Sequence, residues 1–456
     1  MRWAKWLYPG MNIKRWLLLF AVGVILSALG IGLFFRYKLI HVIEASLNQL
    51  LYFANSPLPD NATIAFGAFL LVLGIVLMGV ATRKSIYSIV QSLAPDNNKH
   101  MMDKIFSIRR LAKGPAITVI GGGTGLSVLL RGMKEISNNC TAVVTCADDG
   151  GSSGRIREEF GIIPPGDCRN CLISLADTEP LMEKLMQYRF KGTTELRGHS
   201  FGNLFITAMS DIVGDVEGAL NETSKILKVR GRVIPSTLQP MELVAKLQDG
   251  RTIFGESVIS KARGKIVDIK ALPEGVHATN SAVQAILDAD VVILGPGSLY
   301  TSVIANLLID DIKQALLDTE ATVIYVCNVM TQQGETSGFS AYDHVHALLQ
   351  YTNNTNIIDY VVVNNQFDLQ PELLEKYALE NSEPVINDSD RIKALGIKVV
   401  KANLVSQDNL IRHNPDRLAR TLIRMIYNLH ISSPVDSIFD YFFIKNIMKK
   451  FKGKKG

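Results

Sequence analysis

The sequence predicts an α/β domain with a parallel sheet flanked by helices, preceded by two helices long enough to cross a membrane. Short β-branched runs recur along residues 114–432, and several end in glycines, acids, hydroxyls or amides before a stretch with helical spacing. Ahead of them, segments 16–35 and 63–81 are apolar, uncharged and about twenty residues long, the length that a bilayer requires. We therefore expect a membrane anchor in 1–84, a linker with juxtamembrane helices in 85–113 and a main domain in 114–432.

The anchor has one alternative, a cleaved signal peptide in place of the first span. That alternative fits poorly, because residues 28–35 stay apolar without a small-residue cleavage site and a second span follows. Basic residues precede the first span and follow the second, so the positive-inside rule places the amino terminus and the main domain in the cytoplasm. The outer loop, 36–62, also carries Arg36 and Lys38, which makes this charge bias moderate.

The net charge of +5 comes from the end of the chain, where six lysines fall within the last twelve residues. A nucleic-acid-binding protein spreads basic charge over a folded face, so nucleic acid is not an expected partner. Residues 433–456 combine these lysines with apolar side chains at helical spacing. This pattern is typical of an amphipathic tail on an anionic membrane surface, and a solvated, frayed end is the alternative.

The first strand of the main domain, 116–120, runs directly into a glycine-rich turn before helical spacing begins at Leu126. Glycines let the backbone approach a ligand, and the amides of such a turn favour a phosphate. A plain strand-to-helix corner is the alternative. Leu126 replaces the third glycine of the dinucleotide motif and no Gly-Lys-Ser/Thr follows, so neither NAD nor ATP is indicated. The candidate phosphate contacts are Gly122, Gly123, Thr124 and Gly125.

The second strand, 141–146, leads into a loop that combines two acids, glycines, serines and an arginine. Its carboxylates suit a ribose or a divalent ion, whereas its amides and guanidinium suit phosphate oxygens. A flexible surface loop is the alternative. The candidates here are Asp148, Asp149, Ser152, Gly154 and Arg155.

Two polar loops, 164–170 and 197–203, each open a helix. Asp167 is placed either to cap its helix or to line a site, which leaves Arg169 and Asn170 in the first turn to face a ligand. A lone histidine is more often structural than catalytic, but a histidine between two glycines in a polar loop is a reasonable site residue. The second loop adds His199 and Asn203 as candidates.

Residues 229–270 interrupt the α/β pattern and predict a β-rich insertion or edge ribbon. Segment 244–254 reads as a hairpin with an Asp-Gly turn, and 265–269 as a further strand. No obvious catalytic group lies in this insertion.

Parallel-sheet patterning resumes at strand 290–294, which ends in glycines and hydroxyls that form a second candidate phosphate cradle. Strand 322–327 ends at Asn328, and 358–363 is another strand. Helices follow from Ser340 to about Gln350 and from Asn414-Pro415 through Asn428. Because ligands bind beyond the carboxyl ends of strands in an open α/β sheet, we expect these loops to meet. The candidates are Gly295, Gly297, Ser298, Thr301, Ser302 and Asn328.

The chain has five cysteines, an odd and scattered set that argues against a disulfide framework. Cys168 and Cys171 have redox or zinc spacing. They lack a second pair and nearby histidines, so a metal site is not expected there.

Five motifs in order resemble the YvcK family of gluconeogenesis factors, which is related to CofD, the 2-phospho-L-lactate transferase. They lie at 120–126, 148–155, 165–170, 198–203 and 295–302, with further similarity at 327–331, 334–336 and 343–345. The resemblance covers about 116–429. It implies a Rossmann-like core that binds a UDP-sugar such as UDP-N-acetylglucosamine, and a role in cell shape and cell-wall precursor control during gluconeogenic growth.

On this resemblance, the two glycine-rich loops hold the diphosphate, while Asp148, Asp149, Asp167, Arg169, Asn170, His199 and Asn203 line the cleft. The sequence departs from the family at Cys168 and Cys171, where aliphatic residues are usual, which favours buried apolar roles for them. Familiar members are soluble, so the two spans place this chain in a membrane-anchored subset.

Two classes of function remain open. The first is a regulator that binds a nucleotide sugar without turnover, which the YvcK-like segments favour. The second is a CofD-like transferase acting on an activated phospholactate-type substrate, in which Mg²⁺ held by Asp148 or Asp149 assists attack on a diphosphate and His199 is a further catalytic candidate. A third possibility is a scaffold with a vestigial cleft, which predicts no binding of UDP-sugars or guanine nucleotides. A homodimer is expected by analogy with this fold family.

Overall fold

The computed structural model describes residues 14–34, 60–93, 111–177, 179–193, 195–366, 368–406 and 410–430. The chain divides into two compact units, one before residue 109 and one from residue 109 onward. Most of the predicted outer loop and linker, and the basic tail at 433–456, lie outside the described residues.

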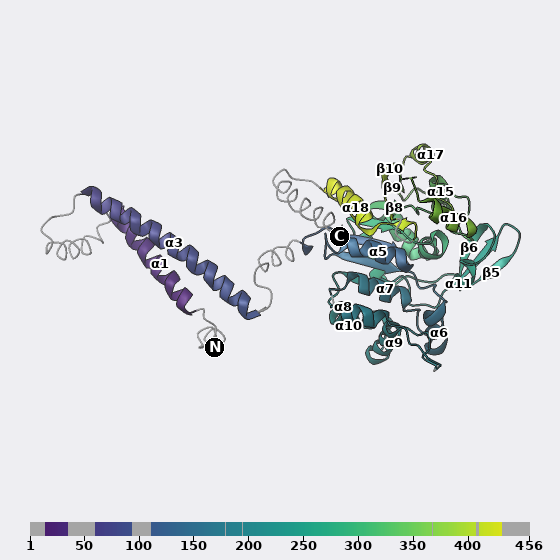
Figure 1. The fold of residues 1–456 in the computed structure, drawn as a ribbon, viewed down its shortest axis with the longest axis horizontal. Helices are drawn as coiled ribbons and strands as arrows, with labels where there is room; N and C mark the ends of the chain where they lie inside the picture. Colours follow the sequence, from purple (N-terminus) through teal and green to yellow (C-terminus); the bar gives the residue numbers. More distant parts are fainter. Residues whose placement is uncertain are drawn as a thin grey trace. The chain divides into compact units, whose positions relative to one another are not determined.

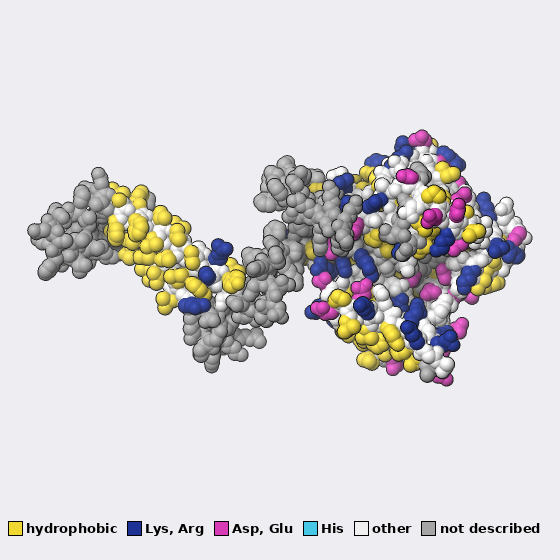
Figure 2. All heavy atoms as spheres, viewed as in Figure 1, with side chains coloured by type: hydrophobic (Ala, Val, Ile, Leu, Met, Phe, Trp, Pro, Cys, Tyr) yellow, Lys and Arg dark blue, Asp and Glu magenta, His cyan; other side chains and the backbone are white. Residues whose placement is uncertain are grey.

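The described residues of the first unit form two helices packed side by side, α1 (Lys14–Phe34) and α3 (Asp60–Leu93) (Figure 1). Both are long and apolar enough to cross a membrane, and hydrophobic side chains cover most of their visible surface in Figure 2. Glycines let the backbones approach closely: a Cβ on Gly23 would lie 2.9 Å from the Gly74 carbonyl oxygen, and one on Gly30 only 2.8 Å from that of Gly67. Small residues at the contact are typical of helix pairs in membranes.

The second unit is built on a seven-stranded sheet in which every neighbouring pair is parallel. The strand order is β10-β9-β8-β7-β1-β2-β3, which confirms the predicted α/β class. Gly121 of β1 pairs with Val144 of β2, and Ile120 of β1 pairs with Leu294 of β7, so the three strands end close together. The strands are β1 (Ile117–Gly121), β2 (Cys140–Val144), β3 (Arg232–Pro235), β7 (Val291–Leu294), β8 (Thr322–Val326), β9 (Tyr360–Asn364) and β10 (Lys398–Ala402).

A hydrophobic core lies on each face of the sheet. In β1, Ile117 and Val119 belong to one core and Ile120 to the other, as alternation along a strand requires. The first core includes α5 (Gly123–Met133), α7 (Gly166–Leu175) and α18 (Pro415–His430). The second includes α12 (Asn280–Leu287), α14 (Asp310–Asp318) and α15 (Ala341–Gln350). The unbroken burial of β1, β2 and β7 follows from helices covering both faces.

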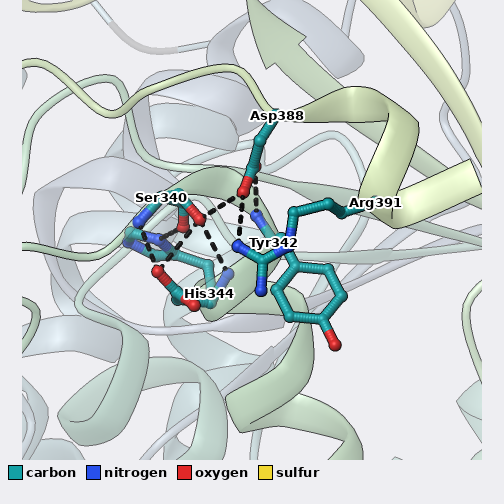
Figure 3. A network of polar contacts seen from close by, with 6 residues as sticks. Ser340, Tyr342, His344, Asp388 and Arg391 are labelled. Atoms are coloured by element: carbon teal, nitrogen blue, oxygen red, sulfur yellow. Dashed lines mark hydrogen bonds and ion pairs between the residues drawn. The ribbon is translucent and has the colours of Figure 1, made fainter.

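Helix α15 begins where Ser340 forms a reciprocal capping box with Asp343, as the predicted helix start required. Asp388 accepts hydrogen bonds from Ser340 Oγ (2.6 Å) and the Tyr342 amide (2.8 Å), and Arg391 pairs with it while stacking on the Tyr342 ring (Figure 3). This network ties α15 to α17 (Ser389–Lys393).

The β-rich insertion is confirmed as a separate antiparallel sheet of β4 (Glu242–Leu247), β5 (Thr252–Phe254) and β6 (Ile266–Leu272), with Asp249-Gly250 at the hairpin turn. Its predicted start is wrong, because β3 pairs in parallel with β2 and is an edge strand of the main sheet. The remaining elements are α6 (Gly151–Phe160), α8 (Pro180–Gln187), α9 (Phe201–Val213), α10 (Val216–Ile226), α11 (Glu256–Ile259), α13 (Ala305–Leu307), α16 (Pro371–Leu379), and the strand pair β11 (Val405–Ser406) and β12 (Arg412–His413).

Candidate functional site

A cavity of about 540 Å³ opens beyond the carboxyl ends of β1, β2, β7 and β8. This is the edge at which open α/β sheets bind ligands. Loops far apart in the sequence form its walls. Its lining residues are Gly122, Gly123, Thr124, Gly125, Thr145, Asp148, Asp167, Glu256, Pro296, Gly297, Ser298, Thr301, Ser302, Asn328, Val329, Met330, Thr331, Gln332, Tyr377, Glu380, Ser382, Ile411, Arg412 and His413.

The first wall is the turn from β1 into α5. The helix begins at Gly123 and not at Leu126 as predicted, so the glycines form its first turn. The turn has no side-chain cap, and Gly123 has a φ of +66°, which favours glycine. Residues 122–125 line the cavity, so the start of α5 and the positive end of its dipole lie at the cavity wall, which suits an anion.

The second wall is the turn from β7 into a short π-helix, η4 (Leu299–Ile304). The two glycine-rich turns touch: a Cβ on Gly125 would lie 2.6 Å from the Pro296 carbonyl oxygen, and one on Gly297 would lie 3.3 Å from the carbonyl oxygen of Gly122. Gly295 does not line the cavity but has a φ of +77° at the start of this turn. The turns of two adjacent strands thus form one continuous cradle.

A buried carboxylate supports the second turn from behind. Glu335 is 1% exposed and accepts hydrogen bonds from the Tyr300 amide (3.1 Å) and Thr301 Oγ1 (3.0 Å). Gln332 donates to the same carboxylate and accepts from Ser298 Oγ at 2.9 Å. Burial raises the pKa of Glu335, and the hydrogen bonds oppose that rise. The hydroxyls at the start of η4 are therefore held in position without a ligand.

Four acids line the cavity, Asp148, Asp167, Glu256 and Glu380, and two of them have strongly shifted pKa values. Burial raises the pKa of Asp167 to about 6, against the hydrogen bond that its Oδ2 accepts from the Gly123 amide at 2.6 Å. Burial and then Asp148 raise the pKa of Glu256 to about 7. Asp167 does not cap α7, because that helix begins at Gly166. Its carboxylate instead accepts a hydrogen bond from the Gly123 amide, in the first turn of α5. Asp149 does not line the cavity, because its carboxylate accepts from the Ser257 amide of α11.

A second group of predicted site residues forms a buried polar cluster outside the cavity lining. Arg169 is 7% exposed and donates to Ser200 Oγ, Asn203 Oδ1 and Asn170 Oδ1, so the prediction that Arg169 is free for a ligand is wrong. Ser152 Oγ accepts from the Ser200 amide and from Asn203. It therefore donates its proton to His199 Nδ1 at 3.2 Å.

The same cluster explains the roles of its other members. Burial lowers the pKa of His199, which favours the neutral ring that this hydrogen bond requires. Arg155 donates to the Arg197 carbonyl oxygen, and a Cβ on Gly154 would collide with the Asp149 backbone. The Arg155 bond joins the loops at 148–155 and 197–203 to each other, whereas the Gly154 contact shapes the first of them.

The far wall of the cavity comes from residues that sequence reasoning missed. Tyr377 and Glu380 come from α16 and the residue after its end, and Ile411, Arg412 and His413 come from the β12 segment. Tyr377 Oη bonds to both the amide and the carbonyl oxygen of Ile411. One feature of the sequence signals this group of residues, the cation Arg412 shortly before the predicted last helix. The other missed lining residues are Thr145, Glu256, Pro296, Val329, Met330, Thr331, Gln332 and Ser382.

Arg412 is exposed and carries the permanent positive charge among the described residues of the cavity lining. His413 donates from Nε2 to the Cys327 carbonyl oxygen, and burial lowers its pKa to about 4, so it is neutral at physiological pH. All five cysteines are buried and free. Burial raises the pKa values of Cys168 and Cys171, which makes both poor metal ligands and fits their expected apolar role.

Comparison with known proteins agrees with this architecture. The family model described as 2-phospho-L-lactate transferase CofD matches residues 117–405. The gluconeogenesis factor of Bacillus subtilis is 44% identical over 317 residues, which cover 69% of this chain and 99% of that protein. The chain belongs to the CofD-related gluconeogenesis factors. The resemblance to the YvcK family is therefore confirmed.

Relatives of this gluconeogenesis factor family differ in how much of the chain they share. A protein from Nostoc sp. (strain PCC 7120) is 46% identical over 431 residues, which cover 94% of each chain. The crystal structure of a Bacillus halodurans protein of the UPF0052 family covers 67% of this chain and 98% of its own, with a TM-score of 0.64 and 43% identity. CofD is named as a transferase, whereas the Bacillus subtilis relative is named as a factor.

Proposed function

We propose that this chain is a membrane-anchored regulator that binds a UDP-sugar, with UDP-N-acetylglucosamine as the expected ligand, and does not turn it over. By analogy with the family it resembles, it controls cell shape and cell-wall precursor metabolism during gluconeogenic growth. The observation that carries the proposal is the cradle formed where the two glycine-rich turns, from β1 and β7, meet.

The cradle suits a diphosphate better than a single phosphate. Each turn offers backbone amides, and the second adds the hydroxyl of Ser302, whereas the hydroxyls of Ser298 and Thr301 already donate to Gln332 and Glu335. Two anion-binding turns side by side match two linked phosphoryl groups. Neither turn carries the lysine of a nucleoside-triphosphate loop.

The lining residues from α16 and from the β12 segment offer groups that a nucleotide needs. The Tyr377 ring provides an aromatic surface for a base, while Arg412 provides a cation for a phosphate. A volume of about 540 Å³ lies within the range usual for small-molecule sites, about 300–1,000 Å³.

Calorimetry with the full chain in detergent tests this proposal. We expect saturable binding of UDP-N-acetylglucosamine with little dependence on Mg²⁺, and weak or no binding of guanine nucleotides. Arg412→Gln is expected to weaken binding by about tenfold to a hundredfold, the value of one charge-assisted hydrogen bond. Arg251→Gln, which removes an exposed arginine from the β4–β5 turn region, is the control and is expected to leave affinity unchanged. Absence of heat with every UDP-sugar would refute the proposal.

A CofD-like transferase is the second candidate, favoured by the match to the CofD family and by the acids on the cavity wall. Mg²⁺ usually takes one or two carboxylates together with substrate phosphates. Asp148 fits that role because it lines the cavity, whereas Asp149 does not. The bound ion would supply charge neutralisation at a diphosphate. Magnesium-dependent consumption of an activated phospholactate by the purified chain, abolished by Asp148→Asn, would favour this candidate.

The anchoring part of the proposal depends on α1 and α3. Their length, their apolar surface and their glycine contacts fit a pair of membrane-spanning helices. The basic residues at 2–15 and 83–84 favour a cytoplasmic location for the amino terminus and the main domain.

A further inference from the structure

We propose that the main domain carries a second anion site, between the end of β10 and α18, that takes a phosphate-bearing ligand. Lys401, Arg417, Arg420 and Arg424 converge there on a hollow of about 510 Å³, which Ala402, Asn403 and Thr421 complete. This hollow shares no lining residue with the cavity described above. We call it the α18 site.

The spacing of the cations places them on one stripe of the helix. Arg417, Arg420 and Arg424 follow one another at three and four residues, so they lie on one face of α18. The opposite face, with Leu418, Leu422 and Ile426, is buried in the core. The stripe is therefore fixed toward the hollow, and it is about 10 Å long at the rise of an α-helix, enough to contact more than one phosphoryl oxygen.

The described residues that line the α18 site carry positive charge without compensating negative charge. No aspartate or glutamate lines it, and within the described part of the chain none of its four cations forms an ion pair. Like charges three or four residues apart each destabilise a helix by about 0.2–0.5 kcal/mol. Arg417 also lies near the start of α18, where the helix dipole disfavours a cation. A bound anion would relieve both costs.

A solvated cationic face is the simpler explanation, and Arg417 argues against it. Its Nη1 donates to Gln366 Oε1 (3.2 Å), the Val405 carbonyl oxygen (3.0 Å) and Asn403 Oδ1. All three acceptors are uncharged, so they fix the guanidinium without neutralising it. Arg420 is likewise fixed, because its Nε donates to the Asp416 carbonyl oxygen at 3.0 Å. Guanidinium groups held in this way can bind phosphate oxygens through parallel N–H bonds.

Two sources could supply such a phosphate. One is the headgroup of an anionic lipid, which a membrane-anchored domain meets at high local concentration. The other is a soluble phosphate compound. Either ligand would contact the arginines of α18. Hydrogen exchange of the α18 backbone amides therefore reports on binding at this site, separately from binding in the first cavity.

The test measures hydrogen exchange of peptides within residues 415–430, using the full chain in nanodiscs. The probes are inorganic pyrophosphate added to phosphatidylcholine discs, and phosphatidylglycerol mixed into the discs. We expect one of them to slow exchange in α18. The site variant is Arg420→Gln with Arg424→Gln, which keeps chain length and helix propensity. The control variant is Lys225→Gln with Lys393→Gln, which removes two exposed helical lysines elsewhere.

The site variant is expected to lose the protection and to weaken the response to the effective probe by about tenfold or more, because two charge-assisted contacts are removed. The control variant is expected to keep it. Protection by pyrophosphate assigns a soluble phosphate, and protection only by phosphatidylglycerol assigns a lipid headgroup. If neither probe slows exchange in α18, or if the site variant responds like the unmodified chain, the proposal is overturned. Unchanged thermal unfolding of the site variant without ligand shows that it is folded.

Discussion

Several carboxyl groups line a cavity that we propose binds an anion. Binding of the anion is therefore expected to be coupled to proton uptake by these carboxyl groups. Asp167 accepts from the Gly123 amide, the same turn that would hold a phosphate, and its pKa is raised to about 6. A bound diphosphate would repel the ionised carboxylate and favour its protonated form. Affinity for a UDP-sugar is therefore expected to rise as the pH falls through about 6.

The variant Asp167→Asn tests this coupling. Its amide oxygen can still accept from Gly123, but no charge develops on raising the pH. We expect binding at pH 8 to tighten by about tenfold, from the repulsion between two charges at short range in a protein environment, and the part of the pH dependence centred near 6 to disappear. Calorimetry between pH 5.5 and pH 8 measures both effects. Asp390→Asn, an exposed carboxyl on α17, is the control. An unchanged pH profile in Asp167→Asn would contradict the assignment.

Single residues also show where sequence reasoning stopped. Arg169, Asn203 and His199 were predicted in the cleft because they are polar and lie in loops before helices. The structure instead buries them against Ser152 and one another. Spacing identifies which loops reach the edge of the sheet, but not which polar side chains bond to each other once there. That choice depends on tertiary contacts between segments about fifty residues apart.

At the scale of elements, the turns after β1 and β7 form one continuous surface because their strands are neighbours in the sheet. The sequence predicted both turns, since each follows a buried strand. It could not predict that a Cβ on Gly125 would strike the Pro296 carbonyl, because strand order is not encoded locally. The predicted start of α5 was also misplaced. Glycines usually indicate a break in a helix, yet here they form its first turn. The start of the insertion was misplaced because strand order is not encoded locally. Strand β3 was predicted as part of the insertion, but it pairs with β2 as an edge strand of the main sheet.

The variant Gly125→Ala tests the contact between the two turns. One methyl group must push the Pro296 backbone away, which opens the cradle and strains both turns. We expect a loss of stability of about 1–3 kcal/mol, the usual cost of overpacking, together with a loss of UDP-sugar affinity. Thermal unfolding and calorimetry measure the two. Arg131→Gln, which removes an exposed ion pair with Glu183 from the same helix, is the control for a change in α5. Normal affinity in Gly125→Ala would show that the turns need not touch in order to bind.

At the scale of the whole molecule, the chain joins an apolar helical pair to a domain that also occurs in relatives lacking most of the first unit's length. The Bacillus subtilis relative aligns over 99% of its own length but only 69% of this chain. The two units are compact by themselves, and both glycine-rich turns, the far cavity wall and the α18 site lie in the second. Location and ligand binding should therefore be separable properties.

Deletion of residues 1–108 tests that separation. The full chain is expected in the membrane fraction, resistant to high salt and alkaline carbonate and released by detergent, because α1 and α3 would each have to leave the hydrocarbon core. The deleted form is expected in the soluble fraction with unchanged affinity for UDP-N-acetylglucosamine. A version that keeps residues 1–108 but carries Leu18→Lys and Leu71→Lys in the two apolar helices provides the matched control, since it retains length while making insertion unfavourable by about 2.5–3.5 kcal/mol per lysine. If the full chain is released by salt alone, the helical pair is a peripheral element and the proposed anchor is wrong. If the deleted form is soluble but no longer binds, the first unit contributes to the ligand site.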